Sequence, residues 1–136
     1  MGGNTKALDV VMEFIKRINS GNAQALAELM TEDHVFQDAL GERFVGRDNM
    51  TAGWTQYFKM VSDYRIRADE FFQTGDTFAL FGSASGSYSQ NGKPAKENFW
   101  EVPAAWRALV RGEQIAEWRV YADNQPLRKL MGAGIP

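Results

Sequence analysis

The stretch "AAWRALVRGEQIAEWRVYAD", from Ala104 to Asp123, decides the fold of this chain. Apolar and polar residues alternate on both sides of the "RGE" segment at 111–113, which is the pattern of two antiparallel strands joined by a short turn. We expect a three-residue loop with Gly112 in the left-handed conformation. In that register Trp106 faces Trp118 across the two strands.

The polar faces of the two strands support this register. It pairs Arg107 with Glu117 and places Arg119 and Tyr121 beside them, on a solvated or subunit-facing outer surface. A two-residue loop would instead bring Glu117 opposite Trp106 and would mix the charged and apolar faces. The sequence therefore favours the three-residue loop.

Two further strands precede this hairpin. The "TGD" segment at 74–76 predicts a turn between them, and "QNGK" at 90–93 predicts a two-residue hairpin turn, because Asn-Gly accepts positive φ at both central positions. This second turn makes Ser83 face Trp100. The small residues of "GSASGSYS" at 82–89 either pack in the core against large aromatic side chains or form the floor of a cavity.

Helical periodicity appears in the first half of the chain and at its end. Apolar residues at helical spacing predict a helix over 6–19, a short second helix over 23–30, and a third helix with Asp48 as its N-cap. The segment "NQPLRKLMG" predicts a short terminal helix between Pro126 and Gly132.

A period of two replaces the helical period after the second helix, so that His34, Phe36 and Asp38 share one face of a strand. The order of elements is helix, helix, strand, helix, four long strands and a short helix. This order predicts an α+β fold in which an antiparallel sheet carries helices on one face. We expect one domain over 1–136, with residues 1–5 as a flexible end.

Composition excludes several classes of function. The net charge of the 136 residues is -2 and no basic run is present, which argues against nucleic acid as a partner. The chain has no cysteine and one histidine, so disulfides and the usual metal sites are not expected. No apolar run reaches the ~20 residues of a membrane span, and no Gly-rich phosphate loop is found. We expect a cytoplasmic protein without a membrane anchor or a cofactor.

The predicted faces gather aromatic residues on the inner side of the sheet. The third helix adds Trp54 to the same side if it packs on the sheet. Aromatic rings offer flat apolar surfaces for a ligand, although an apolar core uses the same side chains. The candidate ligand-binding residues are Trp54, Trp100, Trp106 and Trp118 as flat surfaces, and Tyr57, Ser83 and Asn98 as polar anchors, with Phe14, His34 and Val120 beside them.

The order of elements and three segments resemble the nuclear-transport-factor-2-like superfamily, which includes SnoaL-like polyketide cyclases, ketosteroid isomerase and limonene epoxide hydrolase. The segments are "FIKRINSGNAQALAELMTEDHVFQDALG", "FVGRDNMTAGW" and "VRGEQIAEWRVYAD". The resemblance implies a cone-shaped, strongly curved antiparallel or mixed sheet wrapped around the N-terminal helices, with one pocket. It also implies a homodimer formed through the outer face of the sheet.

The resemblance carries over only at certain residues. Asp38 matches the aspartate base at the end of the first strand of ketosteroid isomerase. Phe14 replaces the tyrosine of that enzyme's oxyanion hole, and Ala104 or Ala105 replaces its second aspartate, so both donors are missing. Val120 stands where limonene epoxide hydrolase has an aspartate. SnoaL-like cyclases use an aspartate and a histidine on the sheet, and the late strands here have no histidine.

Asp38 is the candidate catalytic residue. If Phe36 lies in the core, Asp38 points inward at the rim of the pocket, where poor solvation would raise its pKa and suit acid–base work. The alternative is a polar residue that begins the "DALG" turn. His34 lies ~13 Å away along the strand, so it cannot bond Asp38 and either contacts the other end of a ligand or is structural.

Three hypotheses remain from the sequence. The first is a cofactor-free isomerase, cyclase or hydrolase that acts on a small hydrophobic, cyclic molecule with Asp38 as the proton-transfer group. The second is a binding module that holds such a molecule without chemistry, because the catalytic partners of the relatives are missing. The third is a structural or dimerisation domain whose interior is filled by side chains.

Overall fold

The computed structural model describes residues 2–89 and 93–132, with side chains from residue 6 onward. The described elements follow the α+β order predicted above, with one additional short strand. In chain order they are α1 (Gly2–Ser20), α2 (Ala23–Ala27), β1 (Met30–Gln37), β2 (Arg43–Val45), α3 (Arg47–Met60), β3 (Arg65–Thr74), β4 (Thr77–Ser87), the 3₁₀-helix η1 (Lys96–Asn98), β5 (Phe99–Arg111), β6 (Gln114–Ala122) and α4 (Gln125–Met131).

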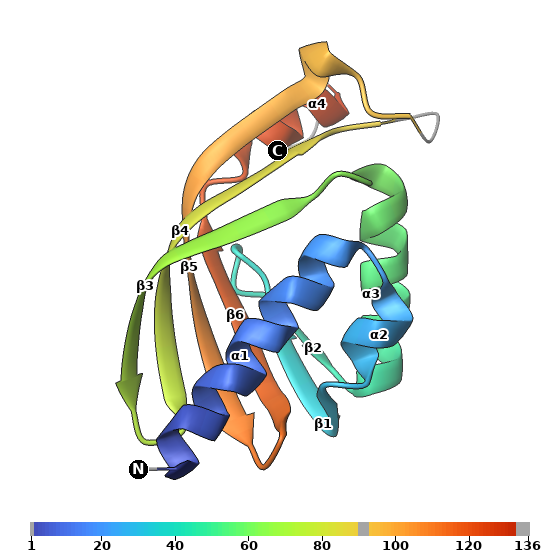
Figure 1. Cartoon of the computed structure of the whole chain (residues 1–136). Helices are drawn as coiled ribbons and strands as arrows, with labels where there is room; N and C mark the ends of the chain where they lie inside the picture. The colour runs from blue at the N-terminus through green and yellow to red at the C-terminus, as the bar shows by residue number, and fades with distance from the viewer. Residues whose placement is uncertain (1, 90–92, 133–136) are drawn as a thin grey trace.

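The strands form one six-stranded sheet in the order β2-β1-β6-β5-β4-β3. All neighbours are antiparallel except β1 and β6, which run parallel, so the sheet is mixed. Figure 1 shows β4 and β5 bending strongly along their length, with α1 lying along one side of the curved sheet and α2 and α3 packed beside it. This is the curved sheet around N-terminal helices that the resemblance implied.

Several boundaries differ from the sequence predictions. Helix α1 begins at Gly2 rather than at residue 6, and α2 ends at Ala27 because the chain enters β1 at Met30. The N-cap of α3 is Gly46, whereas Asp48 lies in the first turn. The short strand β2 was not predicted, because three residues are too few to show a period of two.

The hairpin between β5 and β6 corrects the predicted loop. Arg111 pairs with Gln114, so the loop has two residues, and Gly112 has a φ of 65° as expected. A β-bulge between Leu109 and Val110 then shifts the pairing by one residue. The bulge restores the predicted faces, although Trp106 now pairs with Val120 instead of Trp118.

The register of β4 was predicted wrongly. Gly86 pairs with Trp100, and Ser83 pairs with Pro103 rather than with Trp100. An odd shift turns every side chain to the opposite face, so Ser83 lies on the outer face while Ala84 is buried inside. The predicted Asn-Gly turn falls on 90–92, which lie outside the described residues.

Close backbone approach explains one of the small residues of β4. A Cβ atom on Gly82 would lie 1.7 Å from the backbone oxygen of Arg67 on β3. The β3–β4 pairing also shifts register between Ala68 and Glu70 at this point. A bulge opposite a glycine allows the sheet to bend sharply, which produces the concave inner face.

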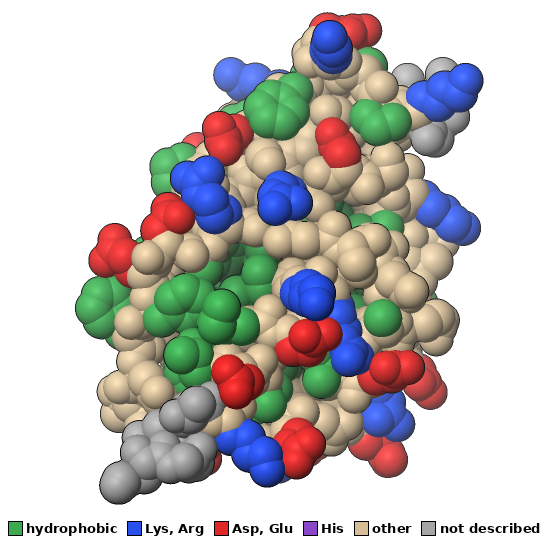
Figure 2. All heavy atoms as spheres, in the orientation of Figure 1, with side chains coloured by type: hydrophobic (Ala, Val, Ile, Leu, Met, Phe, Trp, Pro, Cys, Tyr) green, Lys and Arg blue, Asp and Glu red, His purple; other side chains and the backbone are tan. Residues whose placement is uncertain are grey.

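The core fills the space between α1, α3 and the inner face of the sheet. All four tryptophans are buried, as the predicted faces required. In Figure 2, hydrophobic side chains also gather over the β3–β5 side of the view, beside the start of α1. Among the helices of the described residues, none has the length and apolar character needed to cross a bilayer.

Glu117 corrects the expectation of a solvated outer surface at β6. The residue is only 7% exposed, and its carboxylate is paired with Arg43, Arg107 and Arg119. A carboxylate removed from water requires such partners, because an unpaired buried charge is costly. The cluster therefore fixes β2, β5 and β6 to one another.

Candidate functional site

A cavity of about 370 Å³ lies between α3 and the inner face of the sheet. We call it the aromatic cavity, because six aromatic residues contribute to its wall. They are Phe36, Phe44, Trp54, Tyr57, Tyr64 and Trp100. Small or aliphatic residues of the sheet complete the wall, including Ala84, Val120 and Ala122. The small residues of β4 thus serve both predicted roles, since Ala84 lines the cavity and Gly86 packs in the core.

The rings pack against one another around the cavity. Trp54 of α3 lies edge-on to Tyr57, with the ring centres 6.2 Å apart, and Tyr57 lies edge-on to Tyr64 at 5.0 Å. Tyr64 in turn lies 6.2 Å from Trp100 of β5. Each ring therefore holds its neighbour in place, which makes the wall a pre-formed surface.

Two indole nitrogens at the cavity have no hydrogen-bond partner. Trp54 and Trp100 are 6% and 5% exposed, and the Nε1 atom of each is buried without an acceptor among the described residues. A buried N–H group without a partner costs free energy, so each must be explained. Because both nitrogens are enclosed by protein, the rings present carbon atoms to the cavity.

The two tyrosines of the wall are neutral groups. Burial raises the pKa of Tyr57, and the nearby Tyr64 adds to this effect. Burial also raises the pKa of Tyr64. Both side chains therefore remain protonated phenols over the physiological range and can donate a hydrogen bond. Tyr64 was not among the predicted site residues, although its position just before β3 could have indicated a residue at the edge of the inner face.

Asp38 lines the aromatic cavity at the end of β1. Its Oδ1 atom accepts hydrogen bonds of 2.9 Å from the backbone N–H groups of Leu40 and Glu42. Its own N–H donates to the carbonyl oxygen of Glu42, so the residue also begins the turn between β1 and β2. Asp38 therefore begins the turn, as the second reading expected, and it also lies at the cavity, where both side-chain hydrogen bonds end on Oδ1.

His34 lies deep in the core and does not belong to the cavity wall. Its Nδ1 lies 2.7 Å from the carbonyl oxygen of Ile115, and its Nε2 is buried without a partner. Burial lowers the pKa of His34, whereas the Ile115 carbonyl, Asp33 and Glu117 oppose this effect. The ring is therefore a neutral imidazole whose Nδ1–H donates to Ile115.

The other predicted site residues lie elsewhere. Phe14 and Trp118 are in ring contact at 4.8 Å in the core, and Trp106 stacks on Trp118 at 6.4 Å. Asn98 donates from its side chain to the backbone oxygen of Tyr88, outside the cavity wall. The structure thus brings together Asp38, Trp54, Tyr57, Trp100 and Val120, and it separates them from Phe14, His34, Ser83, Asn98, Trp106 and Trp118.

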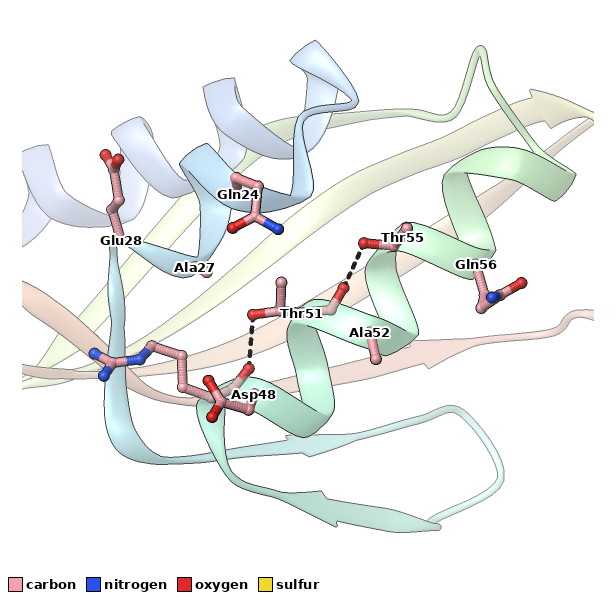
Figure 3. Close-up of a pocket in the computed structure, with 9 residues that line it drawn as sticks. Gln24, Ala27, Glu28, Asp48, Thr51, Ala52, Thr55 and Gln56 are labelled. Atoms are coloured by element: carbon pink, nitrogen blue, oxygen red, sulfur yellow. Dashed lines mark hydrogen bonds between the residues drawn. The ribbon is translucent and has the colours of Figure 1, made fainter.

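A second, more open hollow of about 700 Å³ runs between α2 and α3. Figure 3 shows its polar side chains and the hydroxyls of Thr51 and Thr55, which donate to backbone oxygens of their own helix. Glu28 is paired with Arg17. Because these groups form hydrogen bonds or ion pairs within the protein, this hollow is a weaker candidate for a ligand site than the aromatic cavity.

Among the described residues, no cluster of three His, Asp or Glu side chains could hold a metal ion.

Comparison with known proteins decides the family. The model of the SnoaL-like domain matches residues 11–118, which is most of the chain. The chain belongs to the SnoaL-like domain family. Among curated proteins, no relative matches this SnoaL-like domain.

Solved structures with the same fold are numerous, and three illustrate the range. A protein from Catenulispora acidiphila with a ketosteroid isomerase-like fold, solved in complex with trimethylamine, is 21% identical, with a TM-score of 0.75 and coverage of 93% of each chain. A candidate SnoaL-like polyketide cyclase from Jannaschia sp. is 15% identical, with a TM-score of 0.77 and coverage of 97% of this chain and 94% of that one.

IdmH, a candidate polyketide cyclase from Streptomyces antibioticus, is 21% identical to this SnoaL-like domain. Its TM-score is 0.74, and the match covers 92% of this chain and 97% of that one. Identities at this level establish the common fold, and they do not transfer an activity.

Proposed function

We propose that this SnoaL-like domain binds a small hydrophobic, cyclic molecule in the aromatic cavity and that Asp38 moves a proton of that molecule without a cofactor. One observation carries the proposal. The mostly apolar wall, to which six aromatic residues contribute, contains Asp38 as its only carboxylate among the described residues. A concave apolar site with few polar groups is the usual form of a small-molecule site.

The chemistry that fits these groups is proton abstraction next to a carbonyl group. The Oδ2 atom of Asp38 would accept the proton from carbon, while the electron pair of the C–H bond moves toward the carbonyl oxygen. Tyr57 and Tyr64 belong to the same wall, and their neutral hydroxyls would serve as the donors to that oxygen. Return of the proton to another carbon completes an isomerisation. In a ring closure the enolate carbon instead attacks a second carbonyl carbon of the same molecule, and the proton held by Asp38 is transferred to the oxygen of that second carbonyl.

The comparisons support a cyclic ligand. Two of the similar structures are candidate polyketide cyclases, and a third has a ketosteroid isomerase-like fold and contains a small organic amine. These neighbours share the cone of helices and curved sheet with the present chain. The proposal takes from them only the class of ligand.

Exchange of carbon-bound protons tests the proposal. The protein is incubated in D₂O with a panel of cyclic ketones, and loss of the α-proton signal is followed by NMR. We expect the Asp38→Asn variant to exchange about 10²-fold more slowly than the wild type, because general base catalysis contributes factors of that order. Glu42→Gln, a neighbouring carboxylate outside the cavity wall, is the matched control and should retain the rate. Equal rates for wild type and Asp38→Asn would contradict the proposed role of Asp38.

A second candidate function is binding without chemistry. Phe14 is fully buried against His34 and Trp118, so helix α1 supplies no oxyanion donor from that position, and Val120 supplies no acid. Native mass spectrometry of the purified protein separates the two functions. A co-purified ligand that is recovered unchanged after incubation favours binding alone, whereas conversion to a product favours catalysis.

We also propose that two copies of the chain pair through the outer face of the sheet. Phe72 and Phe81 lie edge-on to each other on that face with ring centres 5.8 Å apart, and they are 56% and 45% exposed. Tyr121 adds a further exposed ring on β6. Exposed aromatic clusters of this kind are typical of protein interfaces. Analytical ultracentrifugation should show a dimer for the wild type and a monomer for Phe81→Lys, and an unchanged mass for the variant would contradict the pairing.

A further inference from the structure

We propose that the aromatic cavity selects cations, and that its ligand carries a small alkylammonium group held over the rings of Trp54, Tyr64 and Trp100 with Asp38 as the counter-ion. The inference rests on the proposed function in one respect, which is that the cavity is the ligand site. It adds the sign of the ligand's charge.

The charges of the wall favour a cation. Asp38 is the only charged residue among the described residues that line the cavity, and the other polar side chains there are neutral amides and phenols, such as Asn49 and Asn124. A carboxylate ligand would meet the like charge of Asp38 without a cationic partner on the wall. A cavity lined by one sign of charge concentrates ligands of the opposite sign.

The arrangement of the rings fits an ammonium group. The ring centre of Tyr64 lies 6.3 Å from that of Trp54 and 6.2 Å from that of Trp100, and the interplanar angles are 41° and 40°. Rings inclined at such angles form a bent wall rather than a flat stack. Ammonium groups with several alkyl substituents bind in aromatic cages of this kind, because ring faces carry partial negative charge.

The buried indole nitrogens support the same ligand. The N–H edge is the positive side of an indole ring, and at Trp54 and Trp100 it is enclosed by protein and has no acceptor. The N–H edges of both rings are therefore not available to a ligand, and it is the ring faces that carry partial negative charge. A ligand that required indole N–H donors would have to rotate these two packed side chains.

Asp38 is prepared as a counter-ion. Two backbone N–H groups hold Oδ1 in place, and neither of these hydrogen bonds occupies Oδ2. The carboxylate does not need to reorganise when a cation binds, because the turn between β1 and β2 already holds it in one conformation. An asparagine at this position could keep both bonds to Oδ1 while removing the charge.

A pair of probes of equal shape tests the inference. Choline and 3,3-dimethylbutan-1-ol differ only in that a charged trimethylammonium group replaces a neutral tert-butyl group. Each is titrated into the wild type, and the indole N–H signals of Trp54 and Trp100 are followed by NMR while calorimetry gives the affinity. We expect choline to bind at least about tenfold more tightly, because a desolvated cation–π contact and a counter-ion each contribute at this level.

Two variants separate the contribution of Asp38 from general effects on the fold. In Asp38→Asn the affinity for choline should fall by about tenfold, while the affinity for the neutral alcohol should stay the same. In Glu42→Gln, which removes a carboxylate of the same turn that does not line the cavity, both affinities should be unchanged.

Other outcomes overturn the inference in distinguishable ways. Equal binding of both probes, or tighter binding of the neutral alcohol, refutes cation selectivity and leaves the cavity as a site for neutral ligands. An equal loss of both probes in Asp38→Asn refutes the counter-ion role. If neither probe moves the two indole signals but cyclic ketones do, the cation inference fails while the proposed function stands. If no compound moves them, both fail.

Discussion

His34 is the only histidine of the chain, so the pH dependence of stability near neutral pH tests its buried, neutral state directly. Burial lowers the pKa of the folded ring, whereas the unfolded chain has an ordinary histidine with a pKa of about 6.5. Between these two values the unfolded state binds more protons than the folded state. Stability is therefore fully present above about pH 6.5 and is lost as the pH falls toward the folded value.

The magnitude follows from this linkage. If the folded ring stays neutral down to about pH 5.5, protonation of the unfolded chain lowers the free energy of unfolding by about 1.4 kcal/mol between about pH 7.5 and 5.5. Protonation of the folded ring at Nε2 is unfavourable, because this buried atom has no hydrogen-bond partner among the described residues. A smaller lowering of the pKa of the folded ring gives a smaller loss, so this value is the upper limit of the effect.

Urea denaturation at the two pH values measures the effect, with His34→Asn as the control. An asparagine amide can still donate to the Ile115 carbonyl, as Nδ1 of His34 does, but it does not titrate. Carboxylates contribute to the pH dependence of both proteins and cancel in the difference. If wild type and variant lose the same free energy on acidification, or if NMR gives His34 a pKa of about 6.5 or above in the folded protein, the argument is wrong.

Two further substitutions, each with a control variant, test the packing. Gly86→Ala should lower the free energy of unfolding by about 1–3 kcal/mol, because the new Cβ would lie 2.3 Å from Cγ1 of Val61. Its control is Gly53→Ala in α3, whose new Cβ would meet nothing closer than 3.8 Å and which should raise the free energy of unfolding by up to about 1 kcal/mol. Both variants are measured by urea unfolding, and a change of the same sign in both would contradict the close approach at Gly86. Glu117→Gln should lower the free energy of unfolding by about 2–4 kcal/mol, because three arginines lose their common carboxylate. Its control, Glu113→Gln on the surface, should change the stability little. A thermal shift of equal size in both variants would show that the cluster around Glu117 contributes nothing.

The fold could be predicted from the sequence because its strongest patterns are local. The turn glycines Gly75 and Gly112 have φ values of 59° and 65°, and the side chain of Asn22 caps α2 by accepting a hydrogen bond from the backbone N–H of Ala25. The faces of β5 and β6 were also predicted correctly, since the alternation around Trp106 is long and unambiguous.

The registers could not be obtained in the same way. A bulge between Leu109 and Val110 compensates for the shorter loop, and nothing in the alternation of residues shows that one residue has been left unpaired. On β4, small residues occupy both faces, so a shift of an odd number of residues has no visible cost in the sequence. The assignment of Ser83 to the inner face failed for this reason.

The candidate site was predictable in part. Asp38, Trp54, Tyr57 and Trp100 do lie on one cavity, whereas Trp106 and Trp118 fill the core beneath it. Sequence alone does not separate the two groups, because core and cavity wall use the same apolar residues at the same positions of the pattern. The difference depends on how far α3 stands from the bent sheet, which only the three-dimensional packing determines.

The central claim is that the aromatic cavity receives a small molecule, and the four indole N–H signals of the protein test it most directly. Two tryptophans, Trp54 and Trp100, line the cavity, and the other two, Trp106 and Trp118, serve as controls within the same molecule. During titration with cyclic ketones and with choline, we expect saturable shifts of the Trp54 and Trp100 signals and small changes at the other two. Signals that stay in place at Trp54 and Trp100, or that move equally at all four tryptophans, would contradict it.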